Sequence, residues 1–161
     1  MMARPRSSAT LACTPNDGRT IRLIIQQPTL AKYRVPVFRE LAHRDQIALK
    51  LVYGSRTDLP NAEAEGFDAE TAPLHWYQIA GRSLFWHTSQ WRYATRRTTD
   101  VLLLTWNVRY LSLLPALLRA KAHGLPTILW GHGYSKQEQA WRAKTRSRVA
   151  RLATALLFYN R

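Results

Sequence analysis

The chain has 161 residues, of which 46% are hydrophobic and 21% charged, a composition typical of a globular domain and not of a disordered chain. Its 24 Lys and Arg against 10 Asp and Glu give a formal net charge of +14, which favours an anionic partner such as nucleic acid, an anionic membrane surface or a phosphate-bearing substrate. The single cysteine, Cys13, excludes an intrachain disulfide, so we expect a reducing compartment.

The first half of the chain begins with a polar stretch, residues 1–19, that we expect to be a disordered leader. An apolar run then predicts a strand, and Pro36 suits the first turn of the helix that follows. Residues 55–73 hold turn formers and half of the acidic side chains, which predicts an exposed excursion. The elements predicted in this half are a strand at 21–26, a loop at 27–34, a helix from Pro36 and a strand at 47–53.

The second half continues with alternating strands and helices. The predicted elements are strands at 75–80, 101–105, 127–130 and 155–159, and helices at 82–97, 114–122 and 136–152. This βαβ spacing predicts an α/β fold with a doubly wound, mostly parallel Rossmann-like sheet. The sequence stops two residues after the last predicted strand, so we expect the boundary of a first domain at this point.

Three loops leave the carboxyl ends of predicted strands, where ligands bind in open α/β sheets. The first loop carries Lys32, Tyr33 and Arg34 beside a helix N-terminus, and it lacks the G-x-G-x-x-G of a dinucleotide site. The alternative for this loop is that Arg34 is simply solvated.

The second loop carries Asn107 and Arg109 between Trp106 and Tyr110. These amide and guanidinium groups can hydrogen-bond a hydroxylated ligand, and the two aromatic rings can stack on it. The alternative is that Trp106 and Tyr110 only pack beneath the loop.

The third loop is Gly131-His132-Gly133, and Ser135 with Glu138 follows at the spacing of a helix capping box. Two glycines allow close backbone approach to a ligand, and His132 can donate a hydrogen bond to developing negative charge. A purely structural histidine is the alternative. The helix N-terminus after this turn favours an anion.

Two classes of enzyme site have no support in the sequence. The five histidines are scattered and one cysteine cannot build a zinc site, so no metal is expected. The G-x-S-x-G motif of serine hydrolases is absent. The helix predicted at 136–152 places Lys144, Arg148 and Arg151 on one stripe, which predicts contact with anionic lipid, with a solvated outer face as the alternative.

Three segments together resemble the N-terminal domain of family-four glycosyltransferases with the GT-B fold. They are Tyr33-Arg-Val-Pro-Val-Phe38, Asp100-Val-Leu-Leu-Leu-Thr-Trp-Asn-Val-Arg-Tyr-Leu111 and Ile128-Leu-Trp-Gly-His-Gly133, and the closing Ala155-Leu-Leu-Phe-Tyr159 fits the strand that ends that domain. The match covers residues 20–161. The first loop departs from the family, because it lacks the glycines that often occur there.

The resemblance implies a hexosyltransferase-like enzyme of polysaccharide biosynthesis that moves a sugar from a nucleotide-sugar donor to a glycan or lipid-linked acceptor. This chain would be its acceptor-side half, inactive without a separate donor-binding domain or chain. Such an enzyme would need no metal cofactor and would be cytoplasmic, peripheral at the inner face of the membrane. The candidate set is His132 as the catalytic residue and, for substrate binding, Lys32, Tyr33, Arg34, Trp106, Asn107, Arg109, Gly131, Gly133 and Ser135.

Two other classes of function remain open on the sequence. A nucleic-acid-binding module would suit the charge of +14, although the charge is spread along the chain and no basic-aromatic RNA motif is present. A non-catalytic scaffold domain that only pairs with another protein is the second alternative.

Overall fold

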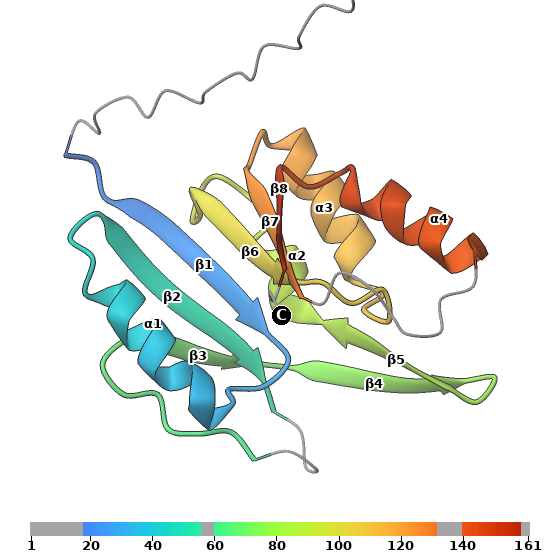
Figure 1. Cartoon of the computed structure of the whole chain (residues 1–161), viewed down its shortest axis with the longest axis horizontal. Helices are drawn as coiled ribbons and strands as arrows, with labels where there is room; N and C mark the ends of the chain where they lie inside the picture. Colours follow the sequence, from blue (N-terminus) through green and yellow to red (C-terminus); the bar gives the residue numbers. More distant parts are fainter. Residues whose placement is uncertain (1–17, 56–59, 132–139, 159–161) are drawn as a thin grey trace, which may run out of the picture.

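A computed structural model describes residues 18–55, 60–131 and 140–158 (Figure 1). It shows an α/β fold built on a six-stranded parallel sheet flanked by helices, compatible with a Rossmann-like fold. In spatial order the strands are β3 (Asp68–Ala72), β2 (Ile47–Gly54), β1 (Ile21–Gln27), β6 (Val101–Thr105), β7 (Thr127–Gly131) and β8 (Ala155–Phe158). The four inner strands, β2, β1, β6 and β7, place apolar side chains in both cores, as expected of strands covered on both faces.

Helices cover the two faces of the sheet and form two cores. The described helices are a 3-10 turn η1 (Lys32–Arg34), α1 (Val35–Ala42), α2 (Thr88–Arg92), α3 (Leu113–Ala122) and α4 (Ala140–Ala150). Because successive strand residues point to opposite faces, Ile25 belongs to one core with Phe38 of α1, and Ile24 to the other with Leu117 of α3. None of the helices in the described ranges is long and apolar enough to cross a membrane.

Most of the predicted elements are confirmed. The strands predicted at 21–26, 47–53, 101–105 and 127–130 are β1, β2, β6 and β7, and the helices predicted from Pro36 and at 114–122 are α1 and α3. The last predicted strand is β8, and its predicted final residue lies outside the described ranges. The helix predicted at 136–152 is described only from 140, where α4 ends two residues earlier than predicted.

The helix predicted at 82–97 is wrong. Its first part is strand β5 (Arg82–His87), which pairs antiparallel with β4 (Leu74–Ile79), and only α2 of this segment is helical. The two strands are joined by Ala80 and Gly81, whose φ angles of 48° and 72° are both left-handed. Positive φ at both loop residues is typical of a two-residue hairpin, whose twist matches that of the flanking strands.

The prediction of an exposed excursion over 55–73 is also wrong in part, because β3 lies within it. This edge strand pairs parallel with β2 despite carrying Asp68 and Glu70. Lys50 on β2 lies 3.4 Å from a carboxylate oxygen of each, so one cation offsets the two acids across the strand pair.

Candidate functional site

The carboxyl ends of β1 and β6 lie side by side at the point where the strand order reverses. From β1 the chain passes outward to β2 and β3, and from β6 it passes outward to β7 and β8 on the other side (Figure 1). In open α/β sheets this reversal leaves a crevice at the carboxyl edge, which is where ligands bind. The residues at this edge are therefore the candidate site.

Arg34 joins the loop after β1 to the end of β7. Its guanidinium donates a hydrogen bond to the Oε1 atom of Gln27, and the guanidinium carbon lies 4.8 Å from the centroid of the Trp130 ring. Gln27 is buried, so its amide is held by the fold and orients the arginine. Arg34 also directly precedes α1, where the Val35 N–H donates to the Lys32 carbonyl and Pro36 has no N–H. The result is a fixed cation beside a helix N-terminus, an arrangement that attracts an anion.

The two residues before Arg34 lie differently. The side chain of Tyr33 is 71% exposed, although its ring remains 5.4 Å from the Arg34 guanidinium. Lys32 lines a groove of about 480 Å³ between α1 and residues 62–65, and neither Arg34 nor Trp130 lines this groove. Arg34 contacts the end of another strand, since its guanidinium lies over the ring of Trp130 on β7.

Trp106 and Gly131 are brought together by the pairing of β6 with β7. The Trp106 N–H donates to the Trp130 carbonyl at 2.8 Å, and a Cβ atom at Gly131 would lie only 2.8 Å from the Cβ of Trp106. Trp106 is only 8% exposed, and the Arg146 guanidinium of α4 lies 5.3 Å from its ring centroid. The indole therefore packs inside the domain, beneath a second arginine.

The loop after Trp106 is held by its own hydrogen bonds. Asn107 accepts the Arg109 N–H on its side-chain oxygen at 3.0 Å, and the Arg109 carbonyl accepts the Phe85 N–H at 2.9 Å. Tyr110 is buried with its ring centroid 5.4 Å from that of Phe85. Asn107 and Tyr110 thus shape the loop, while Arg109 is exposed.

A buried polar network lies behind this edge, and sequence reasoning missed it. Gln90 donates to Gln26 at 2.8 Å and accepts from the Ser112 hydroxyl at 2.6 Å. The same hydroxyl oxygen accepts the His87 N–H at 3.0 Å, and Ser89 bonds the His87 ring at 2.8 Å. All five side chains are at most 2% exposed.

This network connects the end of β1 to the starts of α2 and α3. Burial lowers the pKa of His87 to about 4, outweighing the opposite effect of the Gln27 backbone, so the ring is neutral at neutral pH. Its Nδ1 can then accept from the Ser89 hydroxyl. The pair is too deeply buried to meet a substrate, and its role is to hold the loops at the edge. A signal was present in the sequence: Gln26 and Gln27 are two amides ending an otherwise apolar strand.

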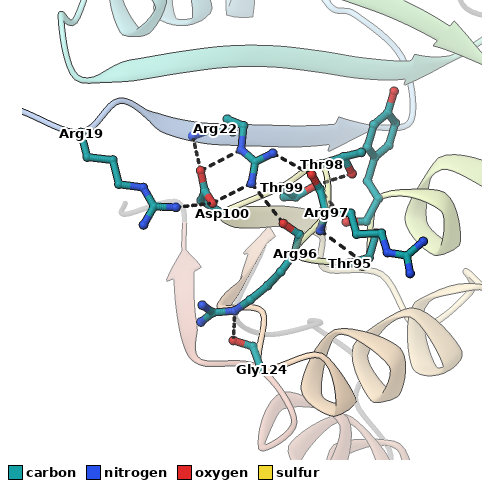
Figure 2. A network of polar contacts seen from close by, with 10 residues as sticks. Arg19, Arg22, Thr95, Arg96, Arg97, Thr98, Thr99, Asp100 and Gly124 are labelled. Atoms are coloured by element: carbon teal, nitrogen blue, oxygen red, sulfur yellow. Dashed lines mark hydrogen bonds and ion pairs between the residues drawn. The ribbon is translucent and has the colours of Figure 1, made fainter.

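A second group of arginines lies at the opposite, amino end of the sheet (Figure 2). Arg22 donates to Asp100 and to the carbonyl oxygens of Arg96 and Arg97, and Arg96 donates to the Gly124 carbonyl at 2.8 Å. The hydrogen bonds from Arg22 hold the pKa of Asp100 well below its ordinary value. Since these guanidiniums already bond the protein's own oxygens, the cluster joins strands and is not the candidate site.

Three of the predicted residues, His132, Gly133 and Ser135, lie outside the described ranges. Within those ranges no group of three or more His, Cys, Asp or Glu side chains could hold a metal ion. No protein-family model and no curated protein matches the chain. The glycosyltransferase resemblance therefore stays a prediction.

Proposed function

We propose that this chain is the acceptor-side domain of a glycosyltransferase, a doubly wound half of a GT-B architecture. Its acceptor would bind at the carboxyl edge between β1, β6 and β7, through a phosphate or a sugar hydroxyl. The observation that carries the proposal is Arg34, which is bonded to buried Gln27 and stacked on Trp130 at the reversal of the strand order.

The chemistry of Arg34 suits a phosphate-bearing acceptor. A guanidinium is planar, always charged and able to donate two parallel hydrogen bonds to phosphate oxygens. Fixing it on an indole ring and a buried amide reduces the entropy lost when it binds. The positive end of the α1 helix dipole lies directly behind it.

The remaining parts of the proposed enzyme follow from the resemblance. A nucleotide-sugar donor would be held by a second domain or chain, because transfer needs both substrates fixed in one closed cleft. His132, which follows the end of β7 in the sequence, is the proposed catalytic residue and would donate to charge developing on the transferred sugar. No metal is required by this scheme.

Calorimetric titration with glucose 1-phosphate tests the acceptor site on the full chain. We expect saturable binding that Arg34→Met weakens by about tenfold or more, the loss typical of a hydrogen-bonded charge. Arg44→Met is the matched control, because it also removes one arginine near α1. The Arg44 side chain is exposed and pairs with Glu40 at 2.7 Å. Equal weakening by both variants, or no saturable binding, would contradict the proposal.

A transfer assay tests whether the donor is bound by a separate domain or chain. The purified chain is incubated with a panel of nucleotide sugars and a lipid-phosphate acceptor, and transferred sugar is counted over time. We expect no sustained transfer by this chain alone. Sustained transfer would show that the donor also binds within these 161 residues.

A further inference from the structure

Strand β4 of the β4–β5 hairpin carries three exposed large apolar side chains close together in sequence. Trp76 is 68% exposed, Tyr77 46% and Ile79 55%. Large exposed apolar groups that cluster on one element mark an interaction site more often than scattered single ones. We call the outer half of this hairpin, residues 76–84, the hairpin tip.

The register of the hairpin places these side chains on both of its faces. Tyr77 lies opposite Leu84 and Ile79 lies opposite Arg82, so these four share one face. Trp76 lies opposite Phe85 on the other face. The tip therefore shows an aromatic ring on either side and an arginine near its turn.

The base of the hairpin is held firmly while the tip projects. The Phe85 N–H donates to the Arg109 carbonyl at 2.9 Å, and the Leu111 N–H donates to the Phe85 carbonyl at 2.8 Å. Figure 1 shows the hairpin extending beyond the carboxyl ends of β1 and β2. A lone two-stranded hairpin is only marginally stable, so this anchoring is what presents the tip as a formed surface.

Acidic side chains are scarce in the part of the sequence that carries the hairpin. No Asp or Glu occurs between Glu70 and Asp100. Residues 71–161 hold 14 Lys and Arg against two acids, Asp100 and Glu138, a formal charge of +12. Asp100 is itself bonded to Arg22, at the opposite edge of the sheet. The half of the chain that carries the hairpin is thus strongly cationic.

We infer that the hairpin tip docks on a lipid bilayer with anionic headgroups. Trp and Tyr favour the boundary between headgroups and acyl chains, where an apolar ring and a polar N–H or O–H are both satisfied. Ile79 and Leu84 would enter the apolar layer, and Arg82 would meet lipid phosphates.

The same observations weigh against two other partners. Single-stranded nucleic acid binds stacked rings along a basic groove, and aliphatic side chains at the tip would add nothing to it. A glycan could stack on the exposed rings, but Ile79 and Leu84 offer its hydroxyls no hydrogen-bond partner. The inference rests on the hairpin and its charge alone, so it stands or falls separately from the proposed transferase activity.

Vesicle sedimentation tests the inference on the full chain. Binding is measured to phosphatidylcholine vesicles, to vesicles that also contain phosphatidylglycerol, and to random DNA. We expect binding to the anionic vesicles, with Tyr77→Ser/Ile79→Ser weakening it about tenfold or more because apolar area is lost. Arg82→Gln should weaken it about fivefold, and only on anionic vesicles.

Leu114→Ser/Leu118→Ser is the matched control. These α3 side chains are 45% and 51% exposed, and these fractions are similar to those of Tyr77 and Ile79. The control should leave vesicle binding within twofold of the parent, and circular dichroism checks that all variants fold. A measurement without variants is quenching of tryptophan fluorescence by lipids with brominated acyl chains, which should occur on binding. Equal binding to both kinds of vesicle, binding to neither, binding to DNA alone, or equal loss in the control would each overturn the inference.

Discussion

Asp100 accepts two hydrogen bonds from Arg22 on one carboxylate oxygen, from the backbone N–H and from Nε, each at 3.0 Å. Its other oxygen accepts from Nη2 of the same arginine at 2.9 Å (Figure 2). One side chain thus binds both the main chain and the guanidinium of a residue on β1, 78 positions away. The contact fastens the start of β6 to β1, the two strands that meet at the candidate site.

Asp100→Asn should lower thermal stability, because the amide cannot supply the charge that Arg22 binds. The expected fall in melting temperature is about 2–4 °C. The lowered pKa of Asp100 also predicts acid sensitivity, since stability present above the ordinary carboxyl pKa of about 3.9 is lost as pH falls below it. Asp68→Asn is the control, because Asp68 is largely exposed and Lys50 keeps Glu70 as a partner. Equal effects of the two changes would contradict this assignment.

The lowered pKa of His87 predicts a second loss of stability in acid, at higher pH than the loss caused by Asp100. Its folded pKa of about 4 lies below the ordinary value of 6.5, so the unfolded chain takes up the proton first as pH falls. The stability contributed by the neutral ring is complete above pH 6.5 and is lost towards pH 4, by about 3 kcal/mol in total.

The measurement is urea unfolding at several pH values. His87→Gln should lower stability at neutral pH but flatten its dependence between pH 6.5 and 4. His75→Gln, at an exposed histidine of the hairpin, should keep the slope of the parent. An unchanged slope in His87→Gln would show that this ring is not the group responsible.

The elements that sequence predicted well are those with a strong local signal. Val101 to Leu104 is an apolar run between Asp100 and Thr105, and the strand predicted at 101–105 is β6 without any shift in its ends. The helix predicted at 82–97 failed because its aromatic residues fit either period, and the turn is Ala-Gly instead of the familiar Asn-Gly. Strand β3 was missed because its two acids are poor strand formers, and the side chains that offset them, Lys50 and Arg92, are distant in sequence.

The candidate site likewise has parts that the local sequence predicted and parts that it did not. Arg34 was predicted from its place after a strand, but its partners Gln27 and Trp130 depend on how three strands are ordered. The buried network of His87, Ser89 and Gln90 could not be placed while that segment was assigned to one helix. The position of a loop can be read from the local sequence, whereas the partners of a side chain across a sheet cannot.

Gly131→Ala should destabilise the protein by about 1–3 kcal/mol, because its Cβ would lie 2.8 Å from the Trp106 Cβ and 3.0 Å from the Trp106 carbonyl oxygen. Thermal unfolding measures the loss. Trp106→Phe in the same background should give no rescue, because the obstructing atoms belong to the backbone and Cβ. A rescue would mean that the indole ring is the obstacle.

Ala80→Asn should stabilise the hairpin, since Ala80 has a φ of 48° that asparagine tolerates better than alanine. The expected gain is about 0.5–1 kcal/mol, measured by chemical unfolding or by slower amide exchange in β4 and β5. Ala80→Val should have the opposite sign, because a branched side chain fits this conformation poorly. A loss in the asparagine variant would contradict the turn geometry.

The pairing of β1 with β6 also sets the order in which the protein can fold. Ile21 pairs with Ile47 across 26 positions and Leu102 with Thr127 across 25, whereas Leu23 pairs with Val101 across 78. Closing a loop about three times longer costs about 1 kcal/mol more in chain entropy. We therefore expect two local βαβ units to form early and to join through β1 and β6 in the slowest step. Mutations at Arg22 and Asp100, which weaken this joint, should then slow folding more than they speed unfolding.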